Sequence, residues 1–242
     1  MILYPAIDIR DGKAVRLREG DFARETVFDA DPVDAAERWV TAGASWLHIV
    51  DLDGARSGRP VNTDAVRRIR EAVPVRLQLG GGLRTMRQID AAATLGIDRL
   101  VLGSAALRSS SLVSDAVARH GEGIAVSLDA RDGKLASDGW MEQTEIPVVE
   151  AAQRLATAGV RTLIFTDIRR DGLLRGPNVS ALIELIAAVD ASVIASGGVG
   201  TVADICAVRD AGVAGVIIGR ALYDGHLDLR QALTLAAGEN AA

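Results

Sequence analysis

Two kinds of apolar pattern alternate along the chain. Short runs rich in β-branched residues, typical of buried strands, begin near Ile2, Trp46, Val75, Arg99, Ile124, Thr162, Ser192 and Gly215. Each run is followed by a segment in which alanine and leucine recur at helical spacing, over residues 32–42, 63–72, 86–95, 112–120, 148–158, 179–189, 202–211 and 229–236. Residues that commonly begin or end helices flank these segments, at Asp31, Asn62, Asn178, Gly43, Gly96, Gly159 and Gly212. Eight such units in a chain of 242 residues predict an α/β fold, the (β/α)8 barrel, with an open doubly wound sheet as the competing arrangement.

An internal repeat relates the two halves of the sequence. Residues 8–13 (DIRDGK) are matched by residues 129–134 (DARDGK), 121 positions later. With an offset of 116 positions, Asp51 matches Asp167, and the glycine segments at 81–85 and 103–105 match those at 197–201 and 219–221. Four successive units therefore recur in order, and no linker rich in proline and serine separates them. We expect a single barrel domain over residues 1–242, built from two (β/α)4 halves at about residues 1–121 and 122–242.

The repeat also indicates which end of the barrel carries the chemistry. In barrels of this kind the loops that follow the strands form the active face. The longest intervals between strand starts follow the first and the fifth strand. We expect both segments to be loops that act as lids and exclude water during a reaction.

Glycine-rich segments follow four of the predicted strands. Glycine lets backbone N–H groups approach a ligand, and the helix that follows adds its positive end, so both features favour a phosphate. A glycine pair by itself is more often only a tight turn, but here the motif occurs at two pairs of strand ends related by the repeat. We predict two phosphate sites on opposite sides of the barrel mouth, one at Gly81, Gly82, Arg84, Gly103 and Ser104, and the other at Gly172, Gly197, Gly198, Gly219 and Arg220.

Two aspartates occupy matched positions at the ends of opposing strands. Asp8 ends the first strand and Asp129 the fifth, so their carboxyl groups are expected to face each other across the mouth. Two carboxyl groups can divide the work of general acid and general base when their surroundings separate their pKa values. Thr166, at the end of the sixth strand, either reflects strand propensity or offers a hydroxyl to the same space.

Four further residues are candidates for substrate binding. Arg16, after the first strand, is either a grip for an anion or a solvated charge, and Trp140, after the fifth, either anchors its loop or stacks on a planar heterocycle. His48 points inward by strand parity, although a buried, hydrogen-bonded histidine is the more common outcome. Asp171, which precedes a glycine, either forms a turn or holds a ligand hydroxyl.

Composition narrows the class of protein. The chain is 49% apolar and 24% charged, as expected of a globular protein and not of a disordered one. A single cysteine excludes an internal disulfide and fits a cytoplasmic location. The formal net charge of -5 gives no general affinity for nucleic acid or anionic lipid, and no apolar run is long enough to cross a membrane. Because neither metal-ligand spacing nor a dinucleotide-binding motif occurs, we expect no metal and no cofactor.

The motifs at the strand ends resemble those of the phosphoribosylformimino-AICAR phosphate isomerase family of histidine biosynthesis, over essentially the whole chain. The resemblance is carried by residues 5–8 (PAID), 48–52 (HIVDL), 80–84 (GGGLR), 127–129 (SLD), 139–140 (GW), 166–168 (TDI), 171–172 (DG) and 196–199 (SGGV). It implies a bisphosphorylated small-molecule substrate that undergoes an Amadori rearrangement from aminoaldose to aminoketose, without a cofactor or an obligate protein partner. It also implies that Asp8 and Asp129 are the catalytic pair, as base and acid respectively, and that Thr166 assists them.

Three alternatives remain open. The sister cyclase of the same pathway resembles this chain but has a cysteine where Ala6 stands. A bifunctional isomerase that also serves tryptophan synthesis carries an arginine two positions before the loop tryptophan, where this chain has Asp138. A barrel that binds a phosphosugar without turning it over is the third alternative, and the presence of both aspartates argues against it.

Overall fold

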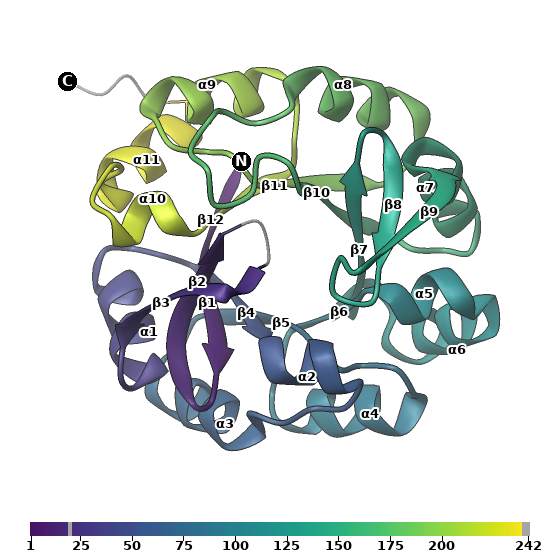
Figure 1. Cartoon of the computed structure of the whole chain (residues 1–242), viewed down its shortest axis with the longest axis horizontal. Helices are drawn as coiled ribbons and strands as arrows, with labels where there is room; N and C mark the ends of the chain where they lie inside the picture. Colours follow the sequence, from purple (N-terminus) through teal and green to yellow (C-terminus); the bar gives the residue numbers. More distant parts are fainter. Residues whose placement is uncertain (19–20, 239–242) are drawn as a thin grey trace.

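Eight parallel strands close on themselves in the computed structural model, which describes residues 1–18 and 21–238 (Figure 1). These strands are β1 (Ile2–Arg10), β4 (Trp46–Asp51), β5 (Arg76–Gly80), β6 (Arg99–Leu102), β7 (Ile124–Arg131), β10 (Thr162–Asp167), β11 (Ser192–Ser196) and β12 (Gly215–Ile218). Each pairs with the next, and the pairing of β12 with β1 completes the ring. The predicted (β/α)8 barrel is therefore confirmed, and the open sheet is excluded. The predicted strand starts agree with the structure except the third, which begins one residue later.

The eight predicted helices surround the barrel (Figure 1). They are α1 (Pro32–Thr41), α3 (Thr63–Ala72), α4 (Met86–Thr94), α6 (Ser110–His120), α7 (Val148–Thr157), α8 (Val179–Ala188), α9 (Val202–Asp210) and α11 (Leu229–Ala236), each within two residues of its predicted bounds. The sequence did not predict the short helices α2 (Leu52–Ser57), α5 (Ser104–Arg108), α10 (Arg220–Tyr223) and η1 (Gly121–Gly123). Such short helices have too few turns to produce an apolar period.

The predicted caps are only partly confirmed. Asp31 and Asn178 accept hydrogen bonds from the first turns of α1 and α8. Asn62 also lies at an N-cap, that of α3, but its side chain donates to Asp51 and Asp53 and makes no capping bond. Asn62 therefore ties the end of β4 to the start of α3.

The two long segments predicted as loops are hairpins that stand on opposite sides of the barrel (Figure 1). The first consists of β2 (Lys13–Arg18) and β3 (Asp21–Asp29), and the second of β8 (Lys134–Ser137) and β9 (Glu142–Pro147). Each continues a barrel strand through a two-residue Asp-Gly turn in which both residues have positive φ, with Asp11 at 48° and Asp132 at 54°. This turn matches the twist of antiparallel strands, so the repeated Asp-Gly pair was a hairpin signal that the loop prediction overlooked.

The barrel interior is filled by an apolar cluster of its own. It comprises Tyr4, Ala6, Trp46, Val101, Ala125, Ile164, Ile194 and Ile217 and is separate from the larger core between the sheet and the helices. Successive side chains of a strand point to opposite faces. The inward series that begins with Tyr4 and Ala6 therefore continues to Asp8, and the series through Ile164 continues to Thr166. The polar candidates accordingly lie at the carboxyl end of the barrel, above an apolar floor.

Within the described ranges, no helix is both long and apolar enough to cross a membrane.

Candidate active site at the barrel mouth

Asp8 ends the inward face of β1 and forms an ion pair with Arg16 of the first hairpin. Oδ2 of Asp8 lies 2.9 Å from Nη1 of Arg16, and both side chains are largely buried. Burial raises the pKa of Asp8, and the Arg16 guanidinium opposes this effect in part. Nε and Nη1 of Arg16 are buried without an aligned hydrogen-bond partner in the described part of the chain. The structure therefore brings Arg16 into the mouth, where its guanidinium lies against the Asp8 carboxylate.

Asp129 lies on the opposite side of the barrel from Asp8. In the ring of strands, β7 is the fourth neighbour of β1 in either direction, which sets the two strands across from each other. Oδ1 of Asp129 accepts a hydrogen bond of 2.8 Å from the Ser127 hydroxyl. Thr166 is the register partner of Asp129 on β10 and is buried. Asp129 and Thr166 thus occupy neighbouring positions on adjacent strands.

Asp171 joins this group from the turn that follows β10. Burial raises the pKa of Asp171, the Arg16 cation lowers it, and the charges of Asp8 and Asp129 raise it further, so that the resulting pKa is about 6. These influences require the three carboxyl groups and the guanidinium to share one space. The mouth therefore contains a carboxyl group whose pKa is raised to about 6, a feature common at catalytic sites.

His48 is held in the barrel below Asp8. Its Nδ1 atom lies 2.9 Å from Nε2 of Gln78, and both side chains are buried. Burial, together with the nearby Arg16 cation, lowers the pKa of His48 to about 3. The His48 ring is therefore neutral at physiological pH, so it can form hydrogen bonds but carries no positive charge.

The predicted phosphate-site glycines fall into two groups. A Cβ atom at Gly81 would lie 2.2 Å from the Asp51 carbonyl oxygen, and one at Gly198 would lie 2.3 Å from the Gly176 carbonyl oxygen. Gly82 and Gly197 are similarly close to backbone atoms, and all four of these glycines have positive φ. Their presence is thus explained by the packing of loops against one another, which is the turn interpretation of the motif.

Two of the remaining three, Gly103 and Gly219, show no such approach to backbone atoms among their nearest neighbours. A Cβ atom at Gly103 would meet no atom within 4 Å. At Gly219 the three nearest atoms would all belong to the Arg16 guanidinium, whose Nη2 atom would lie 1.9 Å away. Gly103 and Gly219 are the matched positions of the repeat, so open space at one and the Arg16 guanidinium at the other fit a pair of ligand sites.

The two predicted arginines bond to the protein itself. Arg220 donates to the Gly172 carbonyl oxygen at 2.8 Å and to Asp224 at 2.7 Å. Arg84 donates to the Ala55 carbonyl oxygen at 3.2 Å. Both side chains are therefore held at the rim beside the glycine motifs, and their roles as phosphate ligands stay predictions.

The second hairpin closes over the Gly103 side of the mouth. The backbone N–H of Asp138 donates to the Ser104 hydroxyl at 2.8 Å. The Asp138 carboxylate pairs with Arg108 and lies 3.9 Å from Arg84. Trp140 follows in the same turn, half-buried and with φ of 71°. The Asp138 carboxylate thus lies near Arg84, at the site where the sequence predicted a bound phosphate.

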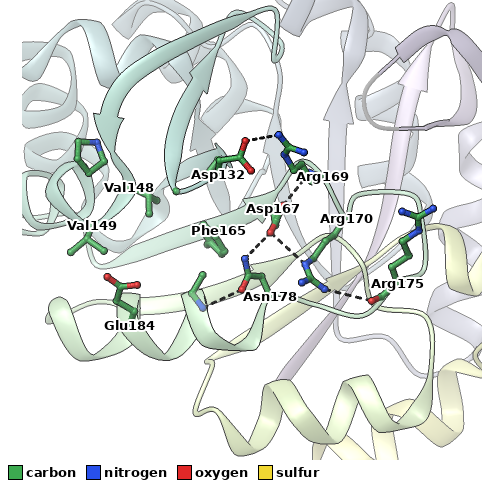
Figure 2. A pocket seen from close by; sticks show the side chains of 14 residues that line it. Asp132, Val148, Val149, Phe165, Asp167, Arg169, Arg170, Arg175, Asn178 and Glu184 are labelled. Atoms are coloured by element: carbon green, nitrogen blue, oxygen red, sulfur yellow. Dashed lines mark hydrogen bonds and ion pairs between the residues drawn. The ribbon is translucent and has the colours of Figure 1, made fainter.

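A cavity of about 670 Å³ opens beside the mouth, between β7, β10, α7 and α8 (Figure 2). Four of its charged side chains are paired with one another. Arg169 lies 2.5 Å from Asp132, and Asp167 accepts from Asn178 at 2.7 Å and lies 3.5 Å from Arg170 (Figure 2). These pairs fix the loop after β10, and neither catalytic candidate lines this cavity.

Sequence reasoning missed several polar residues that shape the mouth. Asp51 is buried and accepts bonds from the backbone of Gly54, Val61 and Asn62. The repeat had paired it with Asp167, which was the signal for a shared role in fixing the loops. Gln78 interrupts an apolar strand, and that interruption was the only signal for its contact with the histidine.

Among the residues described here, no group of three or more histidine, cysteine, aspartate or glutamate side chains is arranged to hold a metal ion.

Comparison with known proteins shows similarity over almost the whole chain. Residues 2–228 match the family described as "Histidine biosynthesis protein". A protein of Xanthobacter autotrophicus is 50% identical over 98% of this chain and 98% of its own length. One of Rhodopseudomonas palustris is 49% identical over 97% of each chain, and one of Shouchella clausii is 46% identical over 98% of each. All three are named 1-(5-phosphoribosyl)-5-((5-phosphoribosylamino)methylideneamino) imidazole-4-carboxamide isomerase.

Proposed function

Because the chain belongs to the histidine biosynthesis protein family, we propose that it catalyses the isomerisation for which its relatives are named. It is an isomerase of histidine biosynthesis that converts an aminoaldose into an aminoketose by an Amadori rearrangement. The observation that supports this function best is the set of acidic groups at the mouth. Asp8 and Asp129 end opposing strands, and both influence the pKa of Asp171.

The rearrangement needs one proton donor and one proton acceptor. In the first step Asp129 gives a proton to the ring oxygen of the phosphoribosylamine, the C1–O bond breaks, and the amine nitrogen forms a C=N double bond to C1. In the second step Asp8 removes the proton from C2, and the electron pair of that C–H bond forms an enolamine. Transfer of the C2 hydroxyl proton and protonation of C1 then give the ketone. C2 is oxidised to a ketone while C1 is reduced to the same extent in the same molecule, so the reaction needs no redox cofactor and its protons move through the acid and the base.

The neighbours of the two aspartates support this division of roles. Arg16 lies beside Asp8 and favours the ionised carboxylate that a base requires. Thr166, next to Asp129, offers a hydroxyl to the substrate as the ring opens. In this proposal, the part of the substrate between its two phosphates contacts His48, Trp140 and Asp171.

The two ends of the substrate are phosphates in this proposal. One phosphate binds at Gly81, Gly82, Arg84, Gly103 and Ser104, and the other at Gly172, Gly197, Gly198, Gly219 and Arg220. The open space at Gly103 supports the first of these sites. The protein is expected to work in the cytoplasm, without nucleic acid, membrane or an obligate protein partner.

Turnover of the bisphosphorylated aminoaldose, followed by absorbance, tests the proposal directly. We expect conversion to the aminoketose by the purified chain without an added metal or cofactor. Phosphoribosyl anthranilate, assayed in parallel, should not be turned over, because Asp138 replaces the arginine of the bifunctional relatives. Formation of an imidazole product that depends on ammonia would instead identify the cyclase. Tight binding of the aminoaldose without turnover would contradict the proposed catalysis.

A further inference from the structure

A chain of polar side chains crosses the otherwise apolar interior of the barrel. Nη1 of Arg99 lies 3.2 Å from Oε1 of Gln78 and 3.1 Å from the Tyr4 hydroxyl. Nε2 of Gln78 in turn lies 2.9 Å from Nδ1 of His48. Arg99, Gln78 and His48 are register partners on β6, β5 and β4. This row of side chains therefore crosses three adjacent strands toward the mouth.

The other half of the barrel shows that this layer can be filled without polar groups. At the matched positions, 116 residues later, His48 corresponds to Ile164, Gln78 to Ile194 and Arg99 to Gly215. Ile164 and Ile194 are register partners in the same way, and both belong to the apolar interior cluster. A buried polar network costs stability unless every member is satisfied. Formation of the barrel therefore does not require polar residues at these positions, and it does not explain why the first half has them.

The donors and acceptors of this network have a definite direction. An arginine guanidinium has donors only, so Arg99 must meet the oxygen of the Gln78 amide and not its nitrogen. The amide NH2 group consequently faces His48 and donates to Nδ1, which must be the unprotonated ring nitrogen. The proton of the neutral ring then lies on Nε2, the atom farther from Gln78.

Arg99 is itself held in a fixed orientation. Its guanidinium carbon lies 4.6 Å from the centre of the Trp46 ring, in cation–π contact. The Tyr4 ring, which accepts from Arg99 through its hydroxyl, packs against the same tryptophan at 5.6 Å. The Arg99 guanidinium therefore has few alternative positions, and it determines the orientation of the Gln78 amide.

We propose that Gln78, oriented by Arg99, is a positioning residue that keeps His48 in the Nε2–H tautomer. His48 then offers a single hydrogen-bond donor to an oxygen of the substrate. Because its free nitrogen is occupied by Gln78, the ring does not compete with Asp8 for the C2 proton. The part of this proposal that concerns the substrate rests on the proposed isomerase function, whereas the tautomer of the free protein does not.

Nitrogen NMR of protein labelled with 15N-histidine reads the tautomer without turnover. The chain has 3 histidines, so the ring signals are assigned by replacing His120 and His226 in turn. The charge of Arg16, which is paired with Asp8, acts on the His48 ring, and Arg99 is linked to the ring through Gln78. We expect the His48 ring to show a protonated Nε2 and an unprotonated Nδ1 throughout the neutral range. A protonated Nδ1, or an averaged signal for the two nitrogens, would overturn the proposal.

Two variants test the positioning role. Gln78→Met removes the donor to Nδ1 and should allow both tautomers to be populated, and Arg99→Met should do the same by freeing the Gln78 amide to turn. Ile194→Met is the matched control, because it changes the equivalent position in the other half, where no polar network exists. We expect the KM for the aminoaldose to rise about 3- to 10-fold in the first two variants, the effect of one lost hydrogen bond, and to change little in the control.

The outcomes distinguish the positioning role of Gln78 from the proposed isomerase function. If the His48 signals of Gln78→Met and Arg99→Met, whichever folds, match those of the unaltered protein, Gln78 does not set the tautomer. An equal rise in KM in the Ile194→Met control would show that the effect is only one of packing, and would also overturn the positioning role. A correct tautomer in a protein without isomerase activity would instead contradict the proposed function alone.

Discussion

Oδ2 of Asp8 lies 2.9 Å from Nη1 of Arg16, and this contact joins the end of a barrel strand to the hairpin that covers it. The pair is largely buried, so each charge depends on the other for stabilisation. Burial raises the pKa of Asp8 and the guanidinium lowers it, so the charge of the proposed base is controlled by a residue on a different element. Movement of the hairpin would therefore change the reactivity of Asp8 as well as the access of substrate.

Replacing Arg16 by methionine should move the acid limb of the pH–activity profile to higher pH. The substitution removes the cation that lowers the pKa of Asp8 and leaves the burial that raises it, so a larger share of Asp8 is protonated at a given pH. A protonated Asp8 cannot accept the C2 proton, so kcat/KM should fall at a higher pH than in the unaltered protein. Measuring kcat/KM from acid to neutral pH checks this shift. Arg16→Lys, which retains the charge, should shift the limb less, and an unmoved limb in Arg16→Met would contradict the role of the ion pair.

Asn substitutions at the two opposing aspartates should each remove most of the activity. Asp8→Asn cannot accept a proton and Asp129→Asn cannot donate one, so each is expected to lower kcat about 10²- to 10⁴-fold, the usual contribution of a general acid or base. Single-substrate kinetics with the aminoaldose measure the effect. Asp190→Asn, at an exposed surface position, is the control and should retain full kcat. Near-normal turnover by either catalytic variant would refute the assigned mechanism.

The barrel could be predicted because its signal is repeated many times over. Each β–α unit carries its own apolar run and its own helical period, so an error of one residue at Val75 does not alter the fold. The hairpins were missed for the opposite reason. Their outer strands, β3 (Asp21–Asp29) and β9 (Glu142–Pro147), contain no buried residue, and exposed strands carry little of the apolar alternation that marks a buried one.

The strand positions of the candidate residues could be predicted, but their contacts could not. Strand parity and the repeat were enough to assign Asp8 and Asp129 to opposing strands at the mouth. The Gln78 contact with His48 depends on the register of neighbouring strands, which no local pattern specifies. The pairing of Asp138 with Arg108 depends on how a hairpin folds back over the barrel, and sequence periodicity has no bearing on that.

Replacing Asp171 by asparagine should change stability in a manner that depends on pH. Its pKa is raised from 3.8 to about 6, so the folded protein binds this proton more tightly than the unfolded chain does. That contribution is fully present below pH 3.8 and is lost as the pH rises through about 6. Asparagine is neutral throughout, so Asp171→Asn should gain stability relative to the unaltered protein between acid and neutral pH, by about 1 to 3 kcal/mol for this half-buried group. Thermal unfolding of both proteins across this range measures the difference.

Asp31 provides a control of opposite sign for the Asp171 experiment. Hydrogen bonds from Arg68 and from the backbone of Val33 lower the pKa of Asp31, so its carboxylate stabilises the fold above pH 3.8 and this stabilisation is lost as the pH falls. Asp31→Asn should therefore lose stability relative to the unaltered protein as the pH rises from acid to neutral. A parallel trend in the two variants would contradict the assignment of Asp171 as a carboxyl group with a raised pKa.

Alanine at Gly103 should weaken substrate binding, whereas alanine at Gly81 should lower stability, although both glycines belong to the same predicted phosphate site. A Cβ atom at Gly103 meets nothing within 4 Å in the protein, so Gly103→Ala should unfold near the normal temperature while the added methyl group intrudes on the space for the phosphate. We expect the KM for the aminoaldose to rise about 10-fold, equivalent to about 1.4 kcal/mol of binding energy. At Gly81 the Cβ atom would lie 2.2 Å from the Asp51 carbonyl oxygen at a φ of 106°, so Gly81→Ala should lose about 1 to 3 kcal/mol of stability. Thermal unfolding and steady-state kinetics of both variants distinguish the effects, and an unchanged KM in Gly103→Ala would show that the open space does not hold the substrate.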